Sequence, residues 1–216
     1  MSLLEESHVF AGLKRQAYKC VLLDPPTRFV AGTKGRPQHY KRMNDADIAA
    51  LPVADLLHPD GAFIFLWVTS PKFYANPGSK TQLSPDAMVR PWGARYSGRM
   101  FEWIKLKKHL EACDFDYHEI VTNEIITTGM GYTSRKNAED CLLFKTGTPK
   151  RLAKDIHEVI FAPRREHSRK PDEAIERIER FCAGPRLELF ARESRKNWDT
   201  WGLEKTMFDM PQEIAA

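Results

Sequence analysis

The run from Ala62 to Val68, with the sequence AFIFLWV, constrains the fold of this chain more than any other segment. All of its residues are apolar, it is bounded by Gly61 and Thr69, and its length suits a strand. A strand that is apolar on both sides must be covered on both sides. That arrangement is typical of a central strand in a parallel sheet flanked by helices, so we expect an α/β domain.

Other segments alternate between strand-like and helix-like patterns. Short apolar stretches of strand length lie at 17–23, 138–144, 157–162 and 186–191. We expect the last of these to be the final strand. One helix is expected after Asn44, a favourable N-cap residue, and a second over 171–182, where Pro171 suits the first turn. Strands that alternate with helices predict a sheet in which parallel pairs dominate.

A single domain over 1–216 is the expected organisation, because 216 residues suit one α/β unit and leave little room for another. We expect irregular insertions near 69–91 and 108–128. Periodicity alone does not decide whether 97–106 is a strand or a helix, since its aromatic residues suit both.

The positive charges of the chain are unevenly distributed. The net charge is +4 with histidine neutral, which by itself indicates no particular partner. The basic residues form three clusters: Lys34, Arg36, Lys41 and Arg42; Lys105, Lys107 and Lys108; Arg164, Arg165, Arg169 and Lys170. Clusters of this kind favour contact with phosphate groups.

Several classes of protein are disfavoured by the sequence. No apolar run of about 18 residues is present, so we expect no membrane-spanning helix. The first residues lack a signal-peptide pattern, which predicts a cytoplasmic protein. The cysteines Cys20, Cys113, Cys141 and Cys182 are scattered without a CxxC pair, so we expect reduced, mostly buried thiols and no metal site.

The segment Leu23-Asp24-Pro25-Pro26 places a carboxylate where a predicted strand ends. Open α/β sheets bind ligands at that edge. The amino group of adenine is a poor nucleophile, because its lone pair is delocalised into the ring. Asp24 and a backbone carbonyl held by the prolines would accept its two hydrogens and aim the lone pair at a methyl donor. The competing interpretation is a simple turn, because Asp-Pro is common at turns.

Several separated blocks, in order, resemble the MT-A70-like adenine-N6 methyltransferases over 19–204. Besides Asp24-Pro25-Pro26, the blocks are His39-Tyr40 with Met43 and Ile48, Phe65-Leu66-Trp67-Val68, Phe101-Glu102-Trp103-Ile104-Lys105, Gly129-Met130-Gly131-Tyr132 with Arg135 and Glu139, His167 to Glu173, Glu188 to Arg192, and Trp198 to Gly202. The resemblance decides 97–106 in favour of a strand. We expect Trp67 and Trp103 to belong to the core.

The resemblance implies a Rossmann-like S-adenosylmethionine-dependent methyltransferase fold of permuted motif order, with the catalytic strand before the cofactor strand. The implied catalytic group is Asp24, Pro25, Pro26 and Thr27. The implied cofactor-binding residues are Lys170, Glu188, Phe190, Arg192, Gly202 and Glu204. The implied substrate-binding residues are Phe29, Tyr40, Lys105, Tyr132, Arg135 and His167. A solvated surface charge is the competing interpretation for Lys105, and a local structural hydrogen bond for His167.

The chain departs from the family pattern at two positions. Thr27 stands where the family usually has an aromatic residue, which would stack on the target base with about 1–3 kcal/mol. Leu203 stands where the family often has Asn.

The resemblance implies a nucleic-acid substrate, with DNA favoured over RNA because the short chain shows no accessory RNA-binding module. Two alternatives stay open: a catalytically weak or silent nucleic-acid-binding homologue, favoured by Thr27, and a methyltransferase for a protein or free nucleotide. Monomer and homodimer are also both open.

Overall fold

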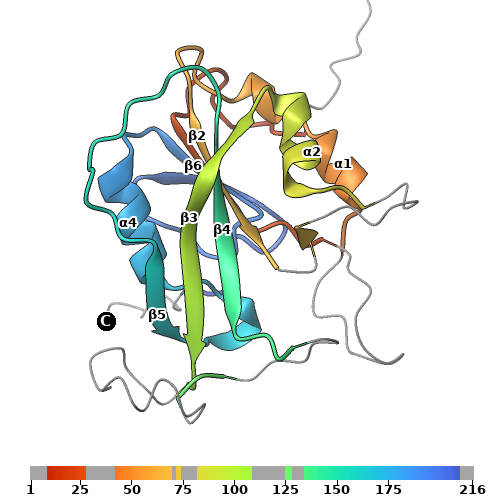
Figure 1. The fold of residues 1–216 in the computed structure, drawn as a ribbon. Helices are drawn as coiled ribbons and strands as arrows, with labels where there is room; N and C mark the ends of the chain where they lie inside the picture. Colours follow the sequence, from red (N-terminus) through yellow and green to blue (C-terminus); the bar gives the residue numbers. More distant parts are fainter. Residues whose placement is uncertain are drawn as a thin grey trace, which may run out of the picture.

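The structure is a computed structural model that describes residues 9–27, 42–69, 72–73, 82–108, 125–127 and 134–209, apart from the side chain of His167. Seven strands form one sheet in the order β5-β3-β4-β2-β1-β6-β7 (Figure 1). They are β1 (Cys20–Leu23), β2 (Phe63–Val68), β3 (Arg95–Leu106), β4 (Ala138–Lys145), β5 (Val159–Pro163), β6 (Arg186–Leu189) and β7 (Trp198–Trp201). The α-helices are α1 (Asp45–Ala49), α2 (Pro85–Val89) and α4 (Asp172–Phe181). Short 3-10 turns are η1 (Val53–Asp55), η3 (Arg90–Trp92) and η4 (Glu166–Ser168).

The sheet is mixed. The pairs β1–β2, β1–β6, β6–β7 and β3–β5 are parallel, whereas β4 runs antiparallel to both β2 and β3. All strands except β4 therefore point the same way, and their carboxyl ends meet at one edge of the sheet. This confirms an α/β fold in which parallel pairs dominate.

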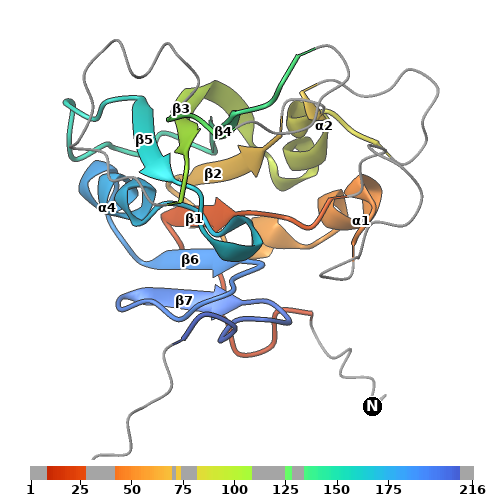
Figure 2. The same ribbon diagram turned by 90° about the horizontal axis from the view of Figure 1, so that it is seen from below.

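Helices cover the two faces of the sheet, which gives two apolar cores (Figure 2). On one face α1 and α2 bury Ile48, Met88 and neighbouring residues against alternate side chains of β1 and β2. On the other face α4 buries Ile178 and neighbouring residues against the remaining side chains of the same strands. The run that forms β2 is buried along its whole length, because it contributes to both cores.

The predicted strands and helices are found close to their predicted bounds, and 97–106 is indeed part of a strand. The prediction that 186–191 is the final strand was wrong, because β7 follows it. The short sequence of β7, Trp-Asp-Thr-Trp, carries no apolar run that would mark a strand. Tertiary contacts hold it instead, including a 2.7 Å hydrogen bond that the Tyr18 hydroxyl donates to Asp199. Burial is the larger cause, and this hydrogen bond the smaller one, that together raise the pKa of Tyr18 to about 12.

Candidate active site

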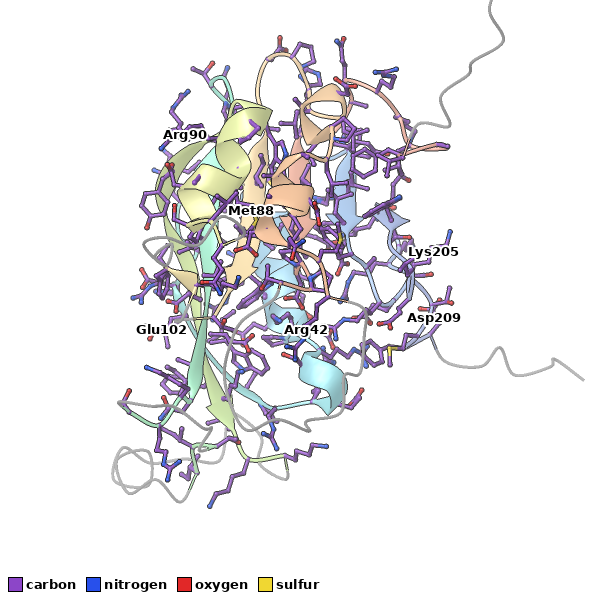
Figure 3. All side chains as sticks on the ribbon, turned by 90° about the vertical axis from the view of Figure 1, so that its right-hand side faces the viewer. Arg42, Met88, Arg90, Glu102, Lys205 and Asp209 are labelled. Carbon is purple, nitrogen blue, oxygen red and sulfur yellow. The ribbon has the colours of Figure 1, made fainter. Side chains whose placement is uncertain are left out.

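A large cavity of about 640 Å³ lies at the carboxyl edge of the sheet, where β1, β2 and β6 end. Arg42 and Met88, which both line it, can be located in Figure 3. A volume of this size is typical of ligand-binding sites. The carboxyl edge is also where open α/β sheets bind ligands.

The segment after β1 forms a tight turn that lines this cavity. The Thr27 amide donates to the Pro25 carbonyl at 2.7 Å, and the Met43 amide donates to the Pro26 carbonyl at 2.9 Å. A carbonyl oxygen has two lone pairs, so the Pro25 oxygen retains acceptor capacity after its bond to Thr27. Because proline fixes φ, the Asp24 carboxylate and this carbonyl are held in a defined relation.

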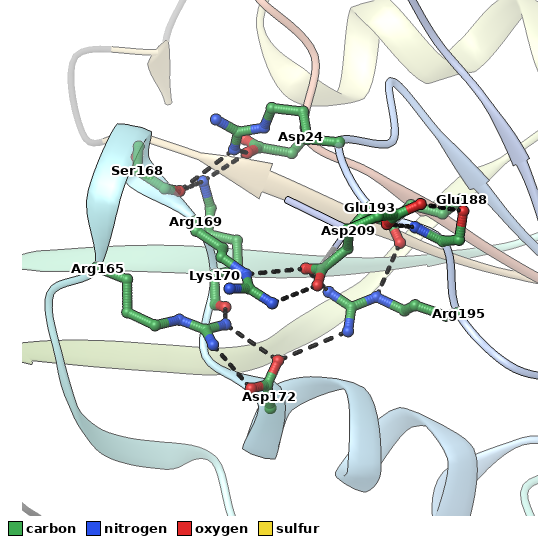
Figure 4. A network of polar contacts seen from close by, with 12 residues as sticks. Asp24, Arg165, Ser168, Arg169, Lys170, Asp172, Glu188, Glu193, Arg195 and Asp209 are labelled. Carbon is green, nitrogen blue, oxygen red and sulfur yellow. Dashed lines mark hydrogen bonds and ion pairs between the residues drawn. The ribbon is translucent and has the colours of Figure 1, made fainter. Parts of the chain in front are cut away.

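Two cations from distant parts of the chain meet the Asp24 carboxylate (Figure 4). The Lys170 ammonium donates to Oδ2 at 2.7 Å, and the Arg192 guanidinium donates to the same oxygen at 2.9 Å. Lys170 precedes α4, and Arg192 follows β6. The structure thus brings together three residues that the family resemblance assigns to catalysis and cofactor binding.

Lys170 is buried and has a second carboxylate partner, Glu139 of β4, at 3.2 Å. Glu139 also accepts a hydrogen bond from Lys105. Burial opposes the charge of Lys170, but the carboxylates of Asp24 and Glu139 outweigh it, and the pKa of Lys170 is raised. Its ammonium also lies 5.5 Å from the centre of the Trp67 ring, a cation–π arrangement.

Glu139 was assigned no role in the site by the sequence, although it lines the cavity. Burial alone would raise its pKa, but Lys170 and Lys105 outweigh that cost, and the pKa of Glu139 is lowered. The signal in the sequence is an acid at the start of an apolar strand, in Ala138 to Lys145. A buried acid in such a strand requires a cationic partner.

Glu139 is expected to make the folded protein sensitive to acid. Because its folded-state pKa lies below the unfolded value of about 4.3, its contribution to stability is fully present above that value. It is lost as pH falls through the folded-state pKa. The wild type should therefore lose more unfolding free energy than Glu139→Gln between pH 5 and the acid limit, measured by urea denaturation at each pH. If the unfolding free energy of the two proteins fell equally with pH below 5, this prediction would be wrong.

The opposite side of the cavity is lined by residues that follow β6 and β7. Phe190 directly follows β6 with a positive φ of 61°, and its ring packs edge-on against that of Trp201, with 5.4 Å between the ring centres. At Gly202 an added Cβ would lie 2.8 Å from the Ala191 carbonyl oxygen, so the two chain segments approach too closely for a side chain. Phe190, Arg192, Gly202 and Glu204 all line the cavity.

Glu188 lies on the other side of β6 and lines a separate, smaller cavity. It accepts a hydrogen bond from Arg195 at 3.1 Å, and burial raises its pKa. The larger cavity is lined by Phe190 and Arg192 but not by Glu188. The assignment of Glu188 to cofactor binding therefore stays a prediction, because Glu188 is not among the residues that line the larger cavity.

Among the predicted substrate-binding residues, those whose side chains the structure describes do not line the larger cavity. Lys105 is paired with Glu139, and Arg135 is exposed just before β4. His167 lies in η4, where only its backbone is described. Phe29, Tyr40 and Tyr132 lie outside the described residues, as do 28–41 and most of 108–128.

Lys72, a further residue of the cavity wall that sequence reasoning missed, belongs to a buried ion pair. The Lys72 ammonium donates to both oxygens of Asp45, at 2.9 and 2.8 Å, and the Asp45 side chain is fully buried. The Leu83 amide donates to the same carboxylate at 2.9 Å. In the sequence, Asp45 shows only the signal of a favourable charge at the start of a helix. Its partner Lys72 lies in a stretch without any recognisable pattern.

Among the described residues, no helix is long and apolar enough to cross a membrane, and no group of three His, Cys, Asp or Glu side chains is placed to hold a metal ion. Cys20, Cys141 and Cys182 are buried and free, as predicted, whereas Cys113 lies outside the described residues.

A mixed α/β sheet with an acid-Pro-Pro turn beside a ligand-sized cavity at its carboxyl edge defines the class of ligand-binding α/β enzymes. The family model MT-A70 matches residues 18–204. The chain therefore belongs to the MT-A70 family and is an enzyme of the N6-adenine methyltransferase type.

Three relatives illustrate this relation. The chain is similar to the type II methyltransferase M.MunI of Mycoplasma sp, with 26% identity over 91% of this chain and 81% of that protein. It is 32% identical to the N(6)-adenosine-methyltransferase MT-A70-like protein of Drosophila melanogaster, over 76% of this chain and 24% of that protein. Its identity to the N(6)-adenosine-methyltransferase catalytic subunit METTL3 of Homo sapiens is 30%, over 76% of this chain and 25% of that protein. The chain thus spans about a quarter of the two adenosine methyltransferases.

Proposed function

We propose that this protein transfers the methyl group of S-adenosylmethionine to N6 of adenine in a nucleic acid, with DNA favoured over RNA. The observation that carries the proposal is the turn after β1. It presents the Asp24 carboxylate and the Pro25 carbonyl, which retains acceptor capacity, at the edge of a cavity of about 640 Å³. Membership of the MT-A70 family supports it.

The residues on the β6–β7 side suit the cofactor. Gly202 lets the segment after β7 approach the Ala191 backbone closely, and Phe190 provides an apolar part of the cavity wall. Glu204 would accept hydrogen bonds from ribose hydroxyls, and the cations Lys170 and Arg192 would attract the carboxylate of the methionine portion. When bound, S-adenosylmethionine supplies an electrophilic methyl group on a sulfonium ion. The permuted motif order belongs to this proposal, because the strand that carries Asp24 precedes β6 and β7.

The residues of the chain act mainly by positioning the adenine amino group. The Asp24 carboxylate accepts one hydrogen of that group, and the Pro25 carbonyl accepts the other. This concentrates the lone pair on N6 and directs it along the line of attack, while Asp24 stabilises the positive charge that develops there. As the new bond to N6 formed, the methyl–sulfur bond would break, a neutral thioether would leave, and N6 would lose one proton, which the Asp24 carboxylate would accept. In duplex DNA the adenine must first leave the base stack.

DNA is favoured as the acceptor by the extent of the matches. One relative, M.MunI, is matched over most of both chains, and we infer that this type II methyltransferase acts on DNA. The N(6)-adenosine methyltransferases are matched over only about a quarter of their length.

The direct test is methyl transfer from labelled S-adenosylmethionine to four acceptors: single- and double-stranded DNA and RNA of one adenine-containing sequence. Matched oligonucleotides in which 2-aminopurine replaces adenine lack the N6 amino group and serve as controls. Label in adenine of DNA supports the proposal, and label in RNA alone would correct the acceptor. Label in peptides or free nucleotides, or in the control oligonucleotides, would refute N6 methylation of nucleic acid.

Thr27 favours a second candidate, a weak or silent homologue that binds nucleic acid. Thr27 lines the cavity beside Pro26 and offers no ring for base stacking. We expect Thr27→Trp to strengthen binding of the target base by about 1–3 kcal/mol, seen as a lower KM for the oligonucleotide. Thr27→Val serves as a control of similar size. Activity that appears only with Trp would identify the natural chain as the silent homologue, and a KM that does not fall would exclude stacking at this position.

A further inference from the structure

The carboxyl edge of the sheet carries cations on both sides. On the β6–β7 side three arginine side chains contact carboxylates, and Lys205, which follows β7, is exposed. Arg169 contacts Glu193, Arg195 contacts Glu188 at 3.1 Å, and Arg192 contacts Asp24 at 2.9 Å. Each of these guanidinium groups contacts a carboxylate of the protein.

The opposite side of the same edge carries cations that have no carboxylate partner within the described part of the chain. Lys107 and Lys108 follow the end of β3, and Arg164 follows the end of β5. Among the residues that the structure describes, no carboxylate pairs with these three side chains. They are called the β3–β5 basic cluster here.

Backbone pairing places the members of this cluster close together, although more than fifty residues separate β3 from β5 in the sequence. Leu106 and Pro163 are register partners in neighbouring parallel strands. The Arg164 amide donates to the Leu106 carbonyl at 3.0 Å, directly beside Lys107. Figure 1 shows β3 and β5 ending side by side at this edge.

The cluster is connected to the catalytic turn by a chain of alternating charges. Asp24 contacts Lys170 at 2.7 Å, Lys170 contacts Glu139 at 3.2 Å, and Glu139 contacts Lys105. Lys105 lies two residues before Lys107 in the same segment. Lys105 is thus paired with Glu139, whereas Lys107, Lys108 and Arg164 form no ion pair with any residue in the described ranges.

We propose that the β3–β5 basic cluster binds the phosphodiester backbone that flanks the target adenine, so that the nucleic acid leaves the active site over β3 and β5. This inference rests on the proposed function and assigns the path of its substrate. Lysine and arginine side chains contact phosphates without reading sequence. The cofactor would then occupy the β6–β7 side of the cavity, and the flanking strand would lie over the ends of β3 and β5.

The test compares two triple variants with identical changes in charge and residue type. The first is Lys107→Ala/Lys108→Ala/Arg164→Ala. The control is Lys150→Ala/Arg151→Ala/Lys154→Ala, whose residues are exposed and lie near the C-terminal end of α4, where Leu152 pairs with Phe181. Binding of a fluorescein-labelled DNA duplex is measured by anisotropy as a function of salt concentration.

Loss of three phosphate contacts should make the slope of log affinity against log salt shallower by about 2.7 for duplex DNA. Between 50 and 200 mM salt the wild type would then lose about 40-fold more affinity than the cluster variant. The control variant should keep the wild-type slope. A cluster variant with the wild-type slope, or equal changes in both variants, would overturn the proposal.

Two further readouts separate this inference from the proposed function. Binding of S-adenosylmethionine and the thermal unfolding midpoint should be unchanged in both variants, because neither set contacts the cavity. With methyl transfer as the readout, the cluster variant should have a raised KM for DNA and an unchanged kcat. If the wild type binds DNA with the expected slope but transfers no methyl group, the function fails and the phosphate path stands. If the wild type methylates adenine and the cluster variant matches it in KM, only the path fails.

Discussion

Replacement of Asp24 by Asn is expected to lower kcat for adenine methylation by about 10²–10³-fold, the usual cost of removing one preorganised electrostatic contact to a reacting group. Asn has nearly the same shape, but it is neutral and cannot offset the positive charge that develops on N6. The substitution also deprives Lys170 and Arg192 of the carboxylate that they share. The measurement is single-turnover methyl transfer at saturating nucleic acid and cofactor.

Asp60→Asn provides the matched control, because the Asp60 side chain is 90% exposed and lies outside the cavity. It should leave kcat unchanged. The Asp24→Asn protein should keep its fold by circular dichroism, so that lost activity reflects chemistry. An Asp24→Asn enzyme with wild-type kcat would show that the carboxylate is not the acceptor for the amino group.

The second large effect concerns stability. Asp45→Ala is expected to lower the free energy of unfolding by about 3–5 kcal/mol, because it leaves the buried Lys72 ammonium without its carboxylate. The Leu83 amide loses its acceptor as well. For a chain of this size the thermal midpoint should fall by roughly 6–20 °C. Differential scanning calorimetry with urea denaturation gives both quantities.

Two further variants show whether burial is the cause. Asp155→Ala removes one partner of an exposed ion pair with Arg180 and should cost less than about 1 kcal/mol. The double variant Asp45→Leu/Lys72→Met removes both buried charges and should recover much of the lost stability. If Asp45→Ala and the double variant lost the same free energy of unfolding, the unpaired charge of Lys72 would not be the cause. The loss would then come from the role of Asp45 in helix α1.

The features that the sequence predicted well are those governed by local pattern. The apolar run of β2 and the acid-Pro-Pro turn after β1 were located because burial on both faces and proline geometry leave a strong local signal. The direction of β4 leaves no such signal. A strand buried on both faces has the same composition whether its neighbours are parallel or antiparallel.

The site was predictable only in part, for the same physical reason. The contacts of Asp24 with Lys170 and Arg192 span 146 and 168 residues, and only the family resemblance associated these positions. The partners of Glu139 and Asp45 depend on how strands and loops meet in space. The composition of their own segments does not reveal them. The pairing of Glu188 with Arg195 is another contact that the composition of β6 does not reveal.

The parallel pairing of β1 with β6 has a consequence for how the protein becomes functional during synthesis. Cys20 pairs with Arg186, and the cavity also needs Gly202 and Glu204 from the segment beyond β7. The Asp-Pro-Pro turn is therefore synthesised well before its cationic partners Lys170 and Arg192, which follow Asp24 by 146 and 168 residues, and before the opposite wall. A nascent chain that stops before β6 carries the Asp-Pro-Pro turn without a place for a cofactor. Because such distant closures are entropically expensive, assembly of the cavity is expected to be a late step of folding.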